Sequence, residues 1–464
     1  MKNYKVILGI ILTCLFFTIG QSQWLETTIP VGGNPRGLVY NVYSNKIYCA
    51  NSDDSCVTVI DGATNSVLTT VPTGNGPIDQ CWNSTNNKVY CANYRSDNVT
   101  VIDGVTNQVI TTVPTGHNPY VSAYYTPGNK IYCANFSSNN ATVIDGATDS
   151  VVTTIPVGNQ TQTIIWNFTY YIYCACYGAG ALYVIDGRTD SVIATIWVGV
   201  MPQGYTQCLV FNAPYNKVYC MNWEDPEHVI VINGATNQVI TTVPVGDLPS
   251  ALAYNATNNK VYCANSGSDN VTVIDGATNS VITTVPVGTH PSLLLWNSAY
   301  NKVFCANEQS DNVTVIDGRT DAVITNITVG ATPCAFTYNP NPQQNRIYVA
   351  NFNSSSVSVI RDGIPGISEY QTLDDISFTP EIYPTPAKSF LAVRWRSTRF
   401  GQTADRQNIK IFDVSGKVVR EIAALPSVTR NDKQTDMKIS LKGINPGIYF
   451  LKLGKETKKF IVAK

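Results

Sequence analysis

Residues 271–288 are VTVIDGATNSVITTVPVG. The halves VTVID and SVITTVPV are rich in β-branched residues, and the polar turn GATN lies between them, which is typical of two strands joined in a hairpin. Near-copies of this stretch recur along the chain. The Asp or Asn before the glycine of the turn stands at positions 61, 103, 145, 186, 233, 275 and 317, and a degenerate eighth copy ends at Asp362. The chain is therefore a repeat array.

The repeat period and its strand content predict the fold class. Successive copies are 41 to 47 residues apart, and one unit contains four candidate strands, at 250–255, 260–265, 271–275 and 280–287. Polar turns rich in Asn and Gly separate them, as hairpins require. Four short strands in such a period are typical of β-propeller blades, so we predict an all-β propeller.

Two features predict the strand order and the number of blades. The fourth strand carries a proline at positions 30, 72, 114, 156, 244 and 286, and proline is confined to sheet edges because it cannot donate a ladder hydrogen bond. We therefore expect this strand at the outer rim. The array opens near Trp24 with a fourth strand and ends with a third strand before Asp362. A closed ring of eight blades, completed by the N-terminal strand, uses every strand, and seven blades is the alternative.

The repeat residues resemble a known family. Units such as NKVYCANSGSDNVTVIDGATNSVITTVPVG, residues 259–288, are similar to the YVTN-type β-propeller repeats of prokaryotic surface and secreted proteins. The resemblance covers Trp24 to about Gly363, with Cys where the family usually has Val in the second strand. It implies a scaffold or binding role at the cell surface, and no catalytic residue set comes with the repeat.

The cysteines favour a packing role over a chemical one. The chain has 13, and seven of them share one repeat position: Cys49, Cys91, Cys133, Cys174, Cys220, Cys263 and Cys305. Equivalent positions in neighbouring blades should lie farther apart than the roughly 7 Å Cα separation that a disulfide allows. We expect buried, unbridged thiols. With no CxxC pair in the sequence, no metal or cofactor is predicted.

The N-terminus and the net charge bear on location. A basic start, MKNYK, precedes the apolar run 6–20, which has the length of a signal-peptide core, and we predict a signal peptide over 1–22. A retained anchor helix is the alternative. No later stretch is apolar enough to cross a bilayer. A net charge of -1, with no basic stripe, argues against nucleic-acid binding.

The composition changes after the repeats. Residues 23–363 form the predicted propeller, 364–377 a linker, and 378–464 a small Ig-like antiparallel sandwich. Its candidate strands are 390–395, 409–414, 418–422, 437–444, 448–453 and 459–463.

The C-terminal residues resemble a second family. The segments IYPTPAKSFLAVRW, IKIFDVSGKVVREI and LKGINPGIYFLKLGKETKKFIVAK closely resemble the C-terminal sorting domain of type IX secretion cargo, with Thr385 where Asn is more common. This implies the secretion machinery as a partner, and a secreted or outer-surface location. A generic adhesion sandwich is the alternative.

Candidate binding residues follow from where the repeats differ. The turns on one face of the ring are uniform, whereas the connections after each fourth strand, on the other face, vary in sequence. In repeat proteins the binding residues usually lie on the face that varies. This variable face should gather Arg36, Asp79, Gln80, His117, Tyr120, Asp247 and His290 near the mouth of the central channel.

Units four and five depart most from the repeat. They contain the insertion MPQGY at 201–205, which holds Gln203 and Tyr205, and the hairpin WEDPEH at 223–228. The hypothesis is an aromatic and acidic patch for a glycan, peptide or protein, formed by Tyr205, Trp223, Glu224, Asp225 and His228. Packing of Trp223 on a neighbouring blade is the alternative.

Catalysis is the second functional hypothesis. The three histidines, His117, His228 and His290, have no metal-site spacing, and the chain has neither a GxSxG elbow nor a phosphate loop. The clustered acids Glu224, Asp225 and Glu227 keep open a hydrolase or lyase that acts on glycans or lactones at the central channel. The main prediction remains a binding or structural scaffold.

Overall fold

The computed structural model describes residues 23–201, 207–224 and 227–362 in full, and the backbone of the strands beyond residue 380. The chain divides into two units near residue 365, each described here by itself. The predicted signal peptide at 1–22 and most of the predicted linker lie outside the described residues. So do Gln203, Tyr205 and Asp225.

Eight four-stranded antiparallel sheets make up the first unit. Blades one to four contain β2 (Pro35–Asn41), β3 (Lys46–Asn51), β4 (Cys56–Asp61) and β5 (Val67–Pro72); β6 (Pro77–Asn83), β7 (Lys88–Asn93), β8 (Asn98–Asp103) and β9 (Val109–Pro114); β10 (Pro119–Tyr125), β11 (Lys130–Asn135), β12 (Asn140–Asp145) and β13 (Val151–Pro156); and β14 (Thr161–Trp166), β15 (Tyr171–Cys176), β16 (Ala181–Asp186) and β17 (Ser191–Trp197).

Blades five to eight contain β18 (Leu209–Asn212), β19 (Lys217–Asn222), β20 (His228–Asn233) and β21 (Val239–Pro244); β22 (Pro249–Asn255), β23 (Lys260–Asn265), β24 (Asn270–Asp275) and β25 (Val281–Pro286); β26 (Pro291–Asn297), β27 (Lys302–Asn307), β28 (Asn312–Asp317) and β29 (Val323–Thr328); and β30 (Pro333–Asn339), β31 (Arg346–Asn351), β32 (Ser356–Asp362) and β1 (Gln23–Pro30). The described residues also hold the 3-10 helices η1 (Thr126–Gly128), η2 (Tyr177–Ala179) and η3 (Phe352–Ser354), and no helix with the length and hydropathy of a membrane span.

The eight-bladed prediction is confirmed, and the seven-bladed alternative is wrong. In blade six the order is β22, β23, β24, β25, from the channel outward, and the predicted strands match these to within two residues. Four of the six residues of β24 are buried and none is exposed, whereas four of the six of β25 are exposed. The proline-bearing fourth strand is therefore the outer rim, as its missing N–H donor requires.

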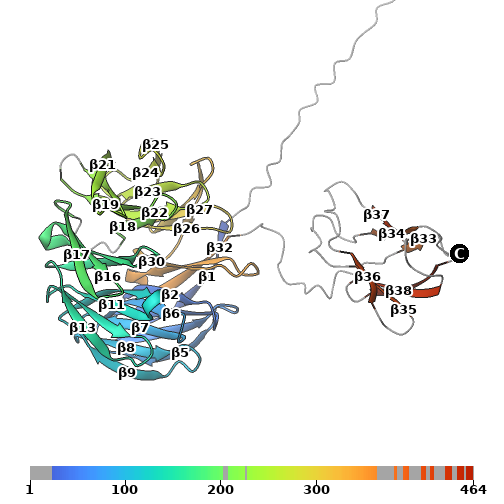
Figure 1. The fold of residues 1–464 in the computed structure, drawn as a ribbon, viewed down its shortest axis with the longest axis horizontal. Helices are drawn as coiled ribbons and strands as arrows, with labels where there is room; N and C mark the ends of the chain where they lie inside the picture. The colour runs from blue at the N-terminus through green and yellow to red at the C-terminus, as the bar shows by residue number, and fades with distance from the viewer. Residues whose placement is uncertain are drawn as a thin grey trace, which may run out of the picture. The chain divides into compact units, whose positions relative to one another are not determined.

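Ring closure joins the two ends of the array. Strand β1 pairs with β32 from Gln23 opposite Asp362 to Pro30 opposite Ser356 (Figure 1). The buried Asp362 carboxylate accepts hydrogen bonds from Lys302 Nζ at 2.5 Å, from Asn297 Nδ2 at 2.7 Å and from Gln23 Nε2 at 3.0 Å. One carboxylate thus joins blade seven, the last repeat strand and the N-terminal strand.

A second ion pair ties the N-terminal strand into blade eight, and its arginine also connects blade eight to blade one. The Arg346 guanidinium donates to both carboxylate oxygens of Glu26, at 2.7 and 2.5 Å. It also donates to the carbonyl of Gly62, in the turn after β4, at 2.7 Å. Arg346 stands where the other second strands carry Lys or Tyr, so the closing blade uses a bidentate side chain at its junction.

Contacts between and within the blades explain why the same sequence motifs recur. In blade six, Lys260 Nζ and Tyr262 Oη both reach Asp321 of blade seven, each at 2.7 Å. The turn aspartates cap their own turns: Asp275 Oδ1 accepts from the N–H of Ala277 and Thr278 at 2.9 and 2.7 Å, and these bonds lower the pKa of Asp275. These aspartates therefore have a structural role in the turns.

The cysteines fill space. All twelve cysteines among the described residues are free, and every one except Cys334 is buried. Burial raises the pKa of Cys49 well above its usual value, and the equivalent thiols are raised in the same way. Because the thiolate is the reactive form, these side chains act as small apolar packing groups, as predicted.

The C-terminal unit is described by its backbone strands. One sheet has the order β33 (Glu381–Tyr383), β34 (Phe390–Arg396), β37 (Gln434–Ser440), and the other has the order β36 (Val418–Ile422), β35 (Ile409–Asp413), β38 (Gly447–Leu453), β39 (Glu456–Val462). Strand β33 was not predicted, and β37 begins three residues before the predicted 437. The packing of the two sheets as an Ig-like sandwich stays a prediction.

Candidate functional site

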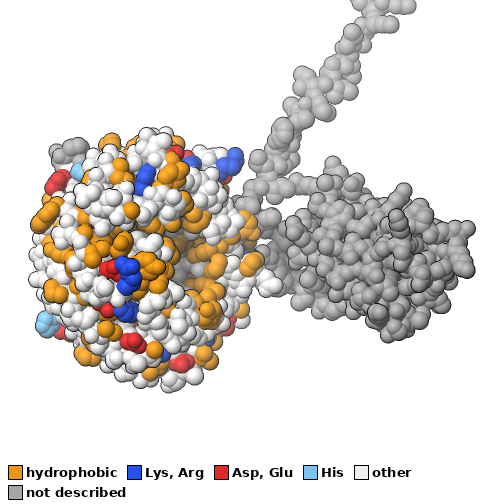
Figure 2. Space-filling model, in the orientation of Figure 1, with side chains coloured by type: hydrophobic (Ala, Val, Ile, Leu, Met, Phe, Trp, Pro, Cys, Tyr) orange, Lys and Arg blue, Asp and Glu red, His pale blue; other side chains and the backbone are white. Residues whose placement is uncertain are grey.

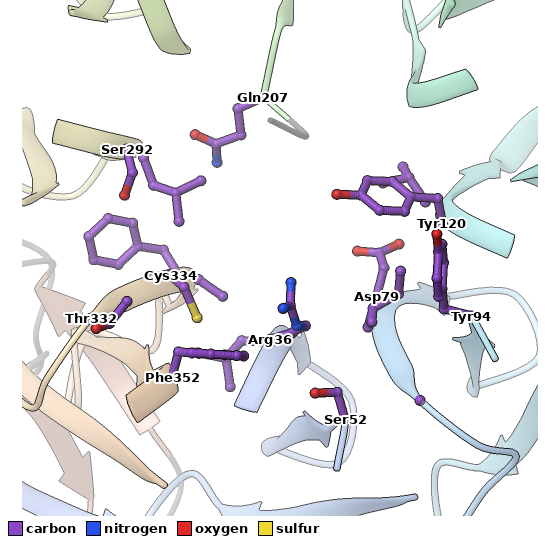
Figure 3. A pocket seen from close by; sticks show the side chains of 18 of the residues that line it. Arg36, Ser52, Asp79, Tyr94, Tyr120, Gln207, Ser292, Thr332, Cys334 and Phe352 are labelled. Carbon is purple, nitrogen blue, oxygen red and sulfur yellow. The ribbon is translucent and has the colours of Figure 1, made fainter. Parts of the chain in front are cut away.

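A cavity of about 680 Å³ lies in the central channel, where the innermost strands begin. Its lining comes from the starts of innermost strands and from turns between second and third strands, contributed by blades one, two, three, five, seven and eight. This is the variable face of the sequence analysis. Figure 3 shows side chains from several blades surrounding one open space.

Two repeat positions supply most of the polar and aromatic lining. We call the first the inner ring: it is the second position of each innermost strand in the repeat alignment, namely Arg36, Ile78, Tyr120, Gln162, Gln207, Ser250, Ser292 and Cys334. The second is the outer ring, the residue after each second strand, namely Ser52, Tyr94, Phe136, Tyr177, Trp223, Ser266, Glu308 and Phe352. The inner ring has six residue types at its eight positions, and five of the eight residues of the outer ring are aromatic. The otherwise uniform blades therefore differ at these two positions.

Arg36 is the cation best placed to meet a ligand. Its guanidinium carbon lies 4.6 Å from the centroid of the Phe352 ring, a cation–π contact between blades one and eight. Among the described residues it forms no ion pair. Its charge acts against the rise in the pKa of Tyr120 across the channel, so the two side chains share one electrostatic environment. Both point toward the open centre of the cavity (Figure 3).

Aromatic rings form a continuous run over blades two and three. The centroids of Tyr94 and Tyr120 are 6.0 Å apart with an interplanar angle of 72°, and those of Tyr120 and Phe136 are 5.7 Å apart. Such edge-to-face and tilted pairs fix ring orientation beyond simple area burial. Tyr94 and Tyr120 line the cavity and present it with a preformed apolar wall.

Two polar side chains accept hydrogen bonds from backbone N–H groups at the free edges of innermost strands. Asp79 Oδ2 accepts from the N–H and the hydroxyl of Ser122 at 2.8 and 3.1 Å. Gln207 Oε1 accepts from the N–H of Leu294 at 3.0 Å. An innermost strand has no partner on its channel side, so these side chains take the place of a ladder neighbour. Burial raises the pKa of Asp79 to about 6, although the bonds from Ser122 pull it down.

The raised pKa of Asp79 predicts a pH-dependent stability. A carboxyl with a pKa of 3.8 in the unfolded chain and about 6 in the folded protein binds more protons when folded, so stability falls as the pH rises through this window and then levels off. We expect Asp79 to contribute a loss of about 2 kcal/mol between these values, a contribution that Asp79→Asn lacks. Thermal melting from pH 4 to pH 8 measures the difference.

The control for this prediction is Asp103→Asn. The turn N–H of Thr106 lowers the pKa of Asp103, so its contribution has the opposite sign and is lost only as the pH falls. That variant should keep the wild-type loss between pH 4 and pH 6. An Asp79→Asn protein that loses as much stability as the wild type over this range contradicts the assignment.

The predicted residues of the variable face separate into two groups. Arg36, Asp79 and Tyr120 line the cavity. His290 does not, but its Nδ1 lies 3.3 Å from Oε2 of Glu308, which does; the contact is not aligned as a hydrogen bond. The remaining predicted residues point elsewhere: His117 is exposed and 2.7 Å from Asp97, Gln80 is buried against Cys91, and Asp247 is in an exposed turn.

The patch predicted in units four and five is described only in part. Trp223 Nε1 donates to the carbonyl of Pro249, in the next blade, at 2.8 Å, which is the contact that the packing alternative required. Glu224 is exposed, and His228 begins β20. None of these three lines the cavity. The patch as a binding site stays a prediction.

Several lining residues were not predicted, among them Tyr94, Gln207, Glu308 and Phe352. A signal was present in the sequence: an aromatic residue directly follows the Asn that ends the second strand in four units, and Tyr177 follows Cys176 at the same position in a fifth. The outer ring is visible in the sequence when the turns after all eight second strands are aligned together. Within the described residues, no group of His, Cys, Asp and Glu has metal-binding geometry.

Comparison with known proteins adds one family and one fold. Residues 381–464 match the family described as the secretion system C-terminal sorting domain. The protein is therefore exported through the type IX secretion system, to the cell surface or the medium, and its C-terminal part engages that machinery. No curated protein matches the chain.

Among solved structures, 1225 chains match, so the likeness by itself identifies a widely used fold and no function. One of them is the Kuenenia stuttgartiensis hydrazine synthase, with 19% identity and a TM-score of 0.50, covering 63% of this chain and 97% of that chain. At this identity the likeness concerns the fold alone.

Proposed function

We propose that the protein is an exported binding scaffold whose propeller holds a ligand, a surface glycan or protein, at the cavity in its central channel. The observation that carries the proposal is the distribution of sequence variation. The strands and outer turns are near-copies, whereas the inner ring differs from blade to blade around a preformed cavity of about 680 Å³, a size common for ligand sites.

The surface supports a local binding site over long-range steering. Charged side chains lie scattered on the visible face of the propeller, without one dominant sign (Figure 2). With a net charge of -1 the chain has little field to attract a polyanion from a distance. Affinity would therefore come from contacts inside the cavity, where Arg36 and the aromatic rings meet.

The finer domain assignments belong to the same proposal. A signal peptide at 1–22 would deliver the chain across the inner membrane, and an Ig-like sandwich at 378–464 would be the sorting domain. The repeats of 23–363 would be of the YVTN type. The sequence motifs of each segment support these assignments, and the matched sorting domain supports the export route.

The test is an array of glycans and surface polymers, probed with full-length protein carrying Tyr120→Ala. Tyr120 is at the centre of the aromatic run, so its loss should lower binding about tenfold or more. Tyr215→Ala is the matched control, because Tyr215 is 49% exposed in a turn on the uniform face. Equal binding by all three proteins would contradict a site in the cavity.

A hydrolase or lyase acting at the same cavity is the second candidate, and one observation favours it. Asp79 combines a pKa raised to about 6 with a place in the cavity wall near Tyr120, and a carboxyl of that pKa can exchange protons near neutral pH. Incubation with lactone, glycan and phosphate-ester substrates tests this candidate. Turnover by the wild type and none by Asp79→Asn would favour an enzyme over a scaffold.

A further inference from the structure

We infer that the ligand of this cavity is an acidic glycan, whose sugar carboxylate pairs with Arg36 while a sugar ring lies against Tyr94 and Tyr120. The inference rests on the proposed function and names the chemical class that the cavity would take. Three observations carry it: the unused hydrogen-bond donors, the engagement of Asp79 by Ser122, and the aromatic wall.

Two polar side chains of the cavity, Arg36 and Gln207, have unused N–H donors. Arg36 offers five N–H groups and is in contact with the face of Phe352, which leaves the edge of the guanidinium open. Gln207 uses its side-chain oxygen to accept from Leu294, so its amide nitrogen remains to donate. Figure 3 shows Arg36 and Gln207 directed into the same space from different blades.

The Ser292 hydroxyl is a separate observation that points to a ligand. It lines the cavity, is 6% exposed, and its Oγ has no hydrogen-bond partner among the described residues. Ser250, at the same inner-ring position one blade earlier, has its Oγ 3.2 Å from the Ala264 carbonyl oxygen and 2.5 Å from that of Pro291, so its single proton has an acceptor. A buried hydroxyl without a partner is costly, and a ligand oxygen would satisfy it.

Of the two acidic residues that line the cavity, Asp79 is engaged inside the protein, because it accepts two hydrogen bonds from Ser122. Glu308 lies 3.3 Å from His290 Nδ1 and is the one carboxylate left to accept. The open N–H donors of Arg36 and Gln207 outnumber it. The cavity therefore favours a ligand rich in acceptors and carrying negative charge.

The geometry around Arg36 selects a carboxylate on a ring. A planar guanidinium matches a planar carboxylate through two parallel hydrogen bonds, and the contact with Phe352 orients that plane. The Tyr94 and Tyr120 rings are nearly perpendicular, with an interplanar angle of 72°, so one ring can offer its negative face to the weakly positive C–H face of a pyranose while the other bounds the sugar. Uronic acids combine both features in one residue.

The experiment measures calorimetric binding of two matched probes, hexagalacturonate and its methyl ester, to full-length protein. The acid should bind and the ester should bind far more weakly. Arg36→Ala should lower the affinity for the acid about 10- to 100-fold, and Arg36→Lys, which keeps the charge and loses the fork, should recover only part of it. Tyr120→Ala should weaken both probes.

Arg319→Ala is the control, because Arg319 is exposed in a turn on the uniform face. It should match the wild type. An unchanged melting temperature in Arg36→Ala excludes misfolding as the cause. Equal affinity for acid and ester, or for the acid and dextran sulfate, overturns the carboxylate assignment. The acidic-glycan inference can fail in this way while the proposed function stands, provided that Tyr120→Ala abolishes binding to some glycan of the array. If no glycan or surface protein binds, the proposed function and the acidic-glycan inference both fail.

Discussion

A chain that ends at residue 377 should remain in the periplasm. Residues 381–464 match the sorting domain, and without that domain the type IX machinery has no signal to recognise. We expect the exported fraction to fall to background, the largest effect of any change considered for this protein. Immunoblots of periplasmic, surface and medium fractions measure it.

The control for the truncation is full-length Arg36→Ala, which alters the propeller cavity and leaves the sorting domain intact. It should be exported like the wild type. Resistance of the truncated protein to limited proteolysis checks that the propeller itself has folded. Export of the truncated chain at wild-type levels would contradict the sorting role and favour the adhesion-module alternative.

Replacing Asp362 with Ala should cause the largest loss of stability from a single substitution. Asp362 is fully buried and meets Lys302, whose side chain is 4% exposed, together with Asn297 and Gln23. Removal of the carboxylate leaves the Lys302 ammonium buried without its counter-ion, which costs about 3–5 kcal/mol. The ring closes at this point, so the loss should also loosen β1. Urea unfolding followed by tryptophan fluorescence measures the shift.

Asp317→Ala is the matched control for this prediction. Asp317 ends β28 as Asp362 ends β32, but its carboxylate accepts from the turn N–H groups of Arg319 and Thr320 without a buried cation. That substitution should cost about 1 kcal/mol. Asp362→Asn, which keeps oxygen and shape, should fall between the two. An Asp362→Ala protein no less stable than Asp317→Ala would contradict the closure argument.

The fold was predictable because repetition multiplies a weak local signal. One VTVID segment could be a strand in many folds, but near-identical copies, with proline in six of the eight fourth strands, determine order, spacing and rim. The count at both ends then requires β1 to complete the last blade, and the pairing of Gln23 with Asp362 confirms this. In the C-terminal unit, β37 departed from its predicted bounds because short strands without a repeat have uncertain ends.

The candidate site was predictable only as a face. Arg36 and Tyr120 were expected at the channel mouth and lie there, whereas His117 stands away beside Asp97 and Trp223 bonds to the next blade. The difference lies in side-chain direction. Residues of the fourth-to-first connections share one face of the ring, but those that line the cavity lie at or next to the start of an innermost strand.

The amino-acid sequence by itself determined the blade, the number of blades, the closure and the export signal, because each of these depends on local strand pattern or on residue words that recur in order. Tertiary structure alone decided which side chains meet. Phe352 and Arg36 are more than three hundred positions apart, and Gln207 reaches Leu294 across two blade boundaries. Such contacts arise when a ring closes and brings equivalent positions of different units around one axis, a relation that linear spacing does not encode.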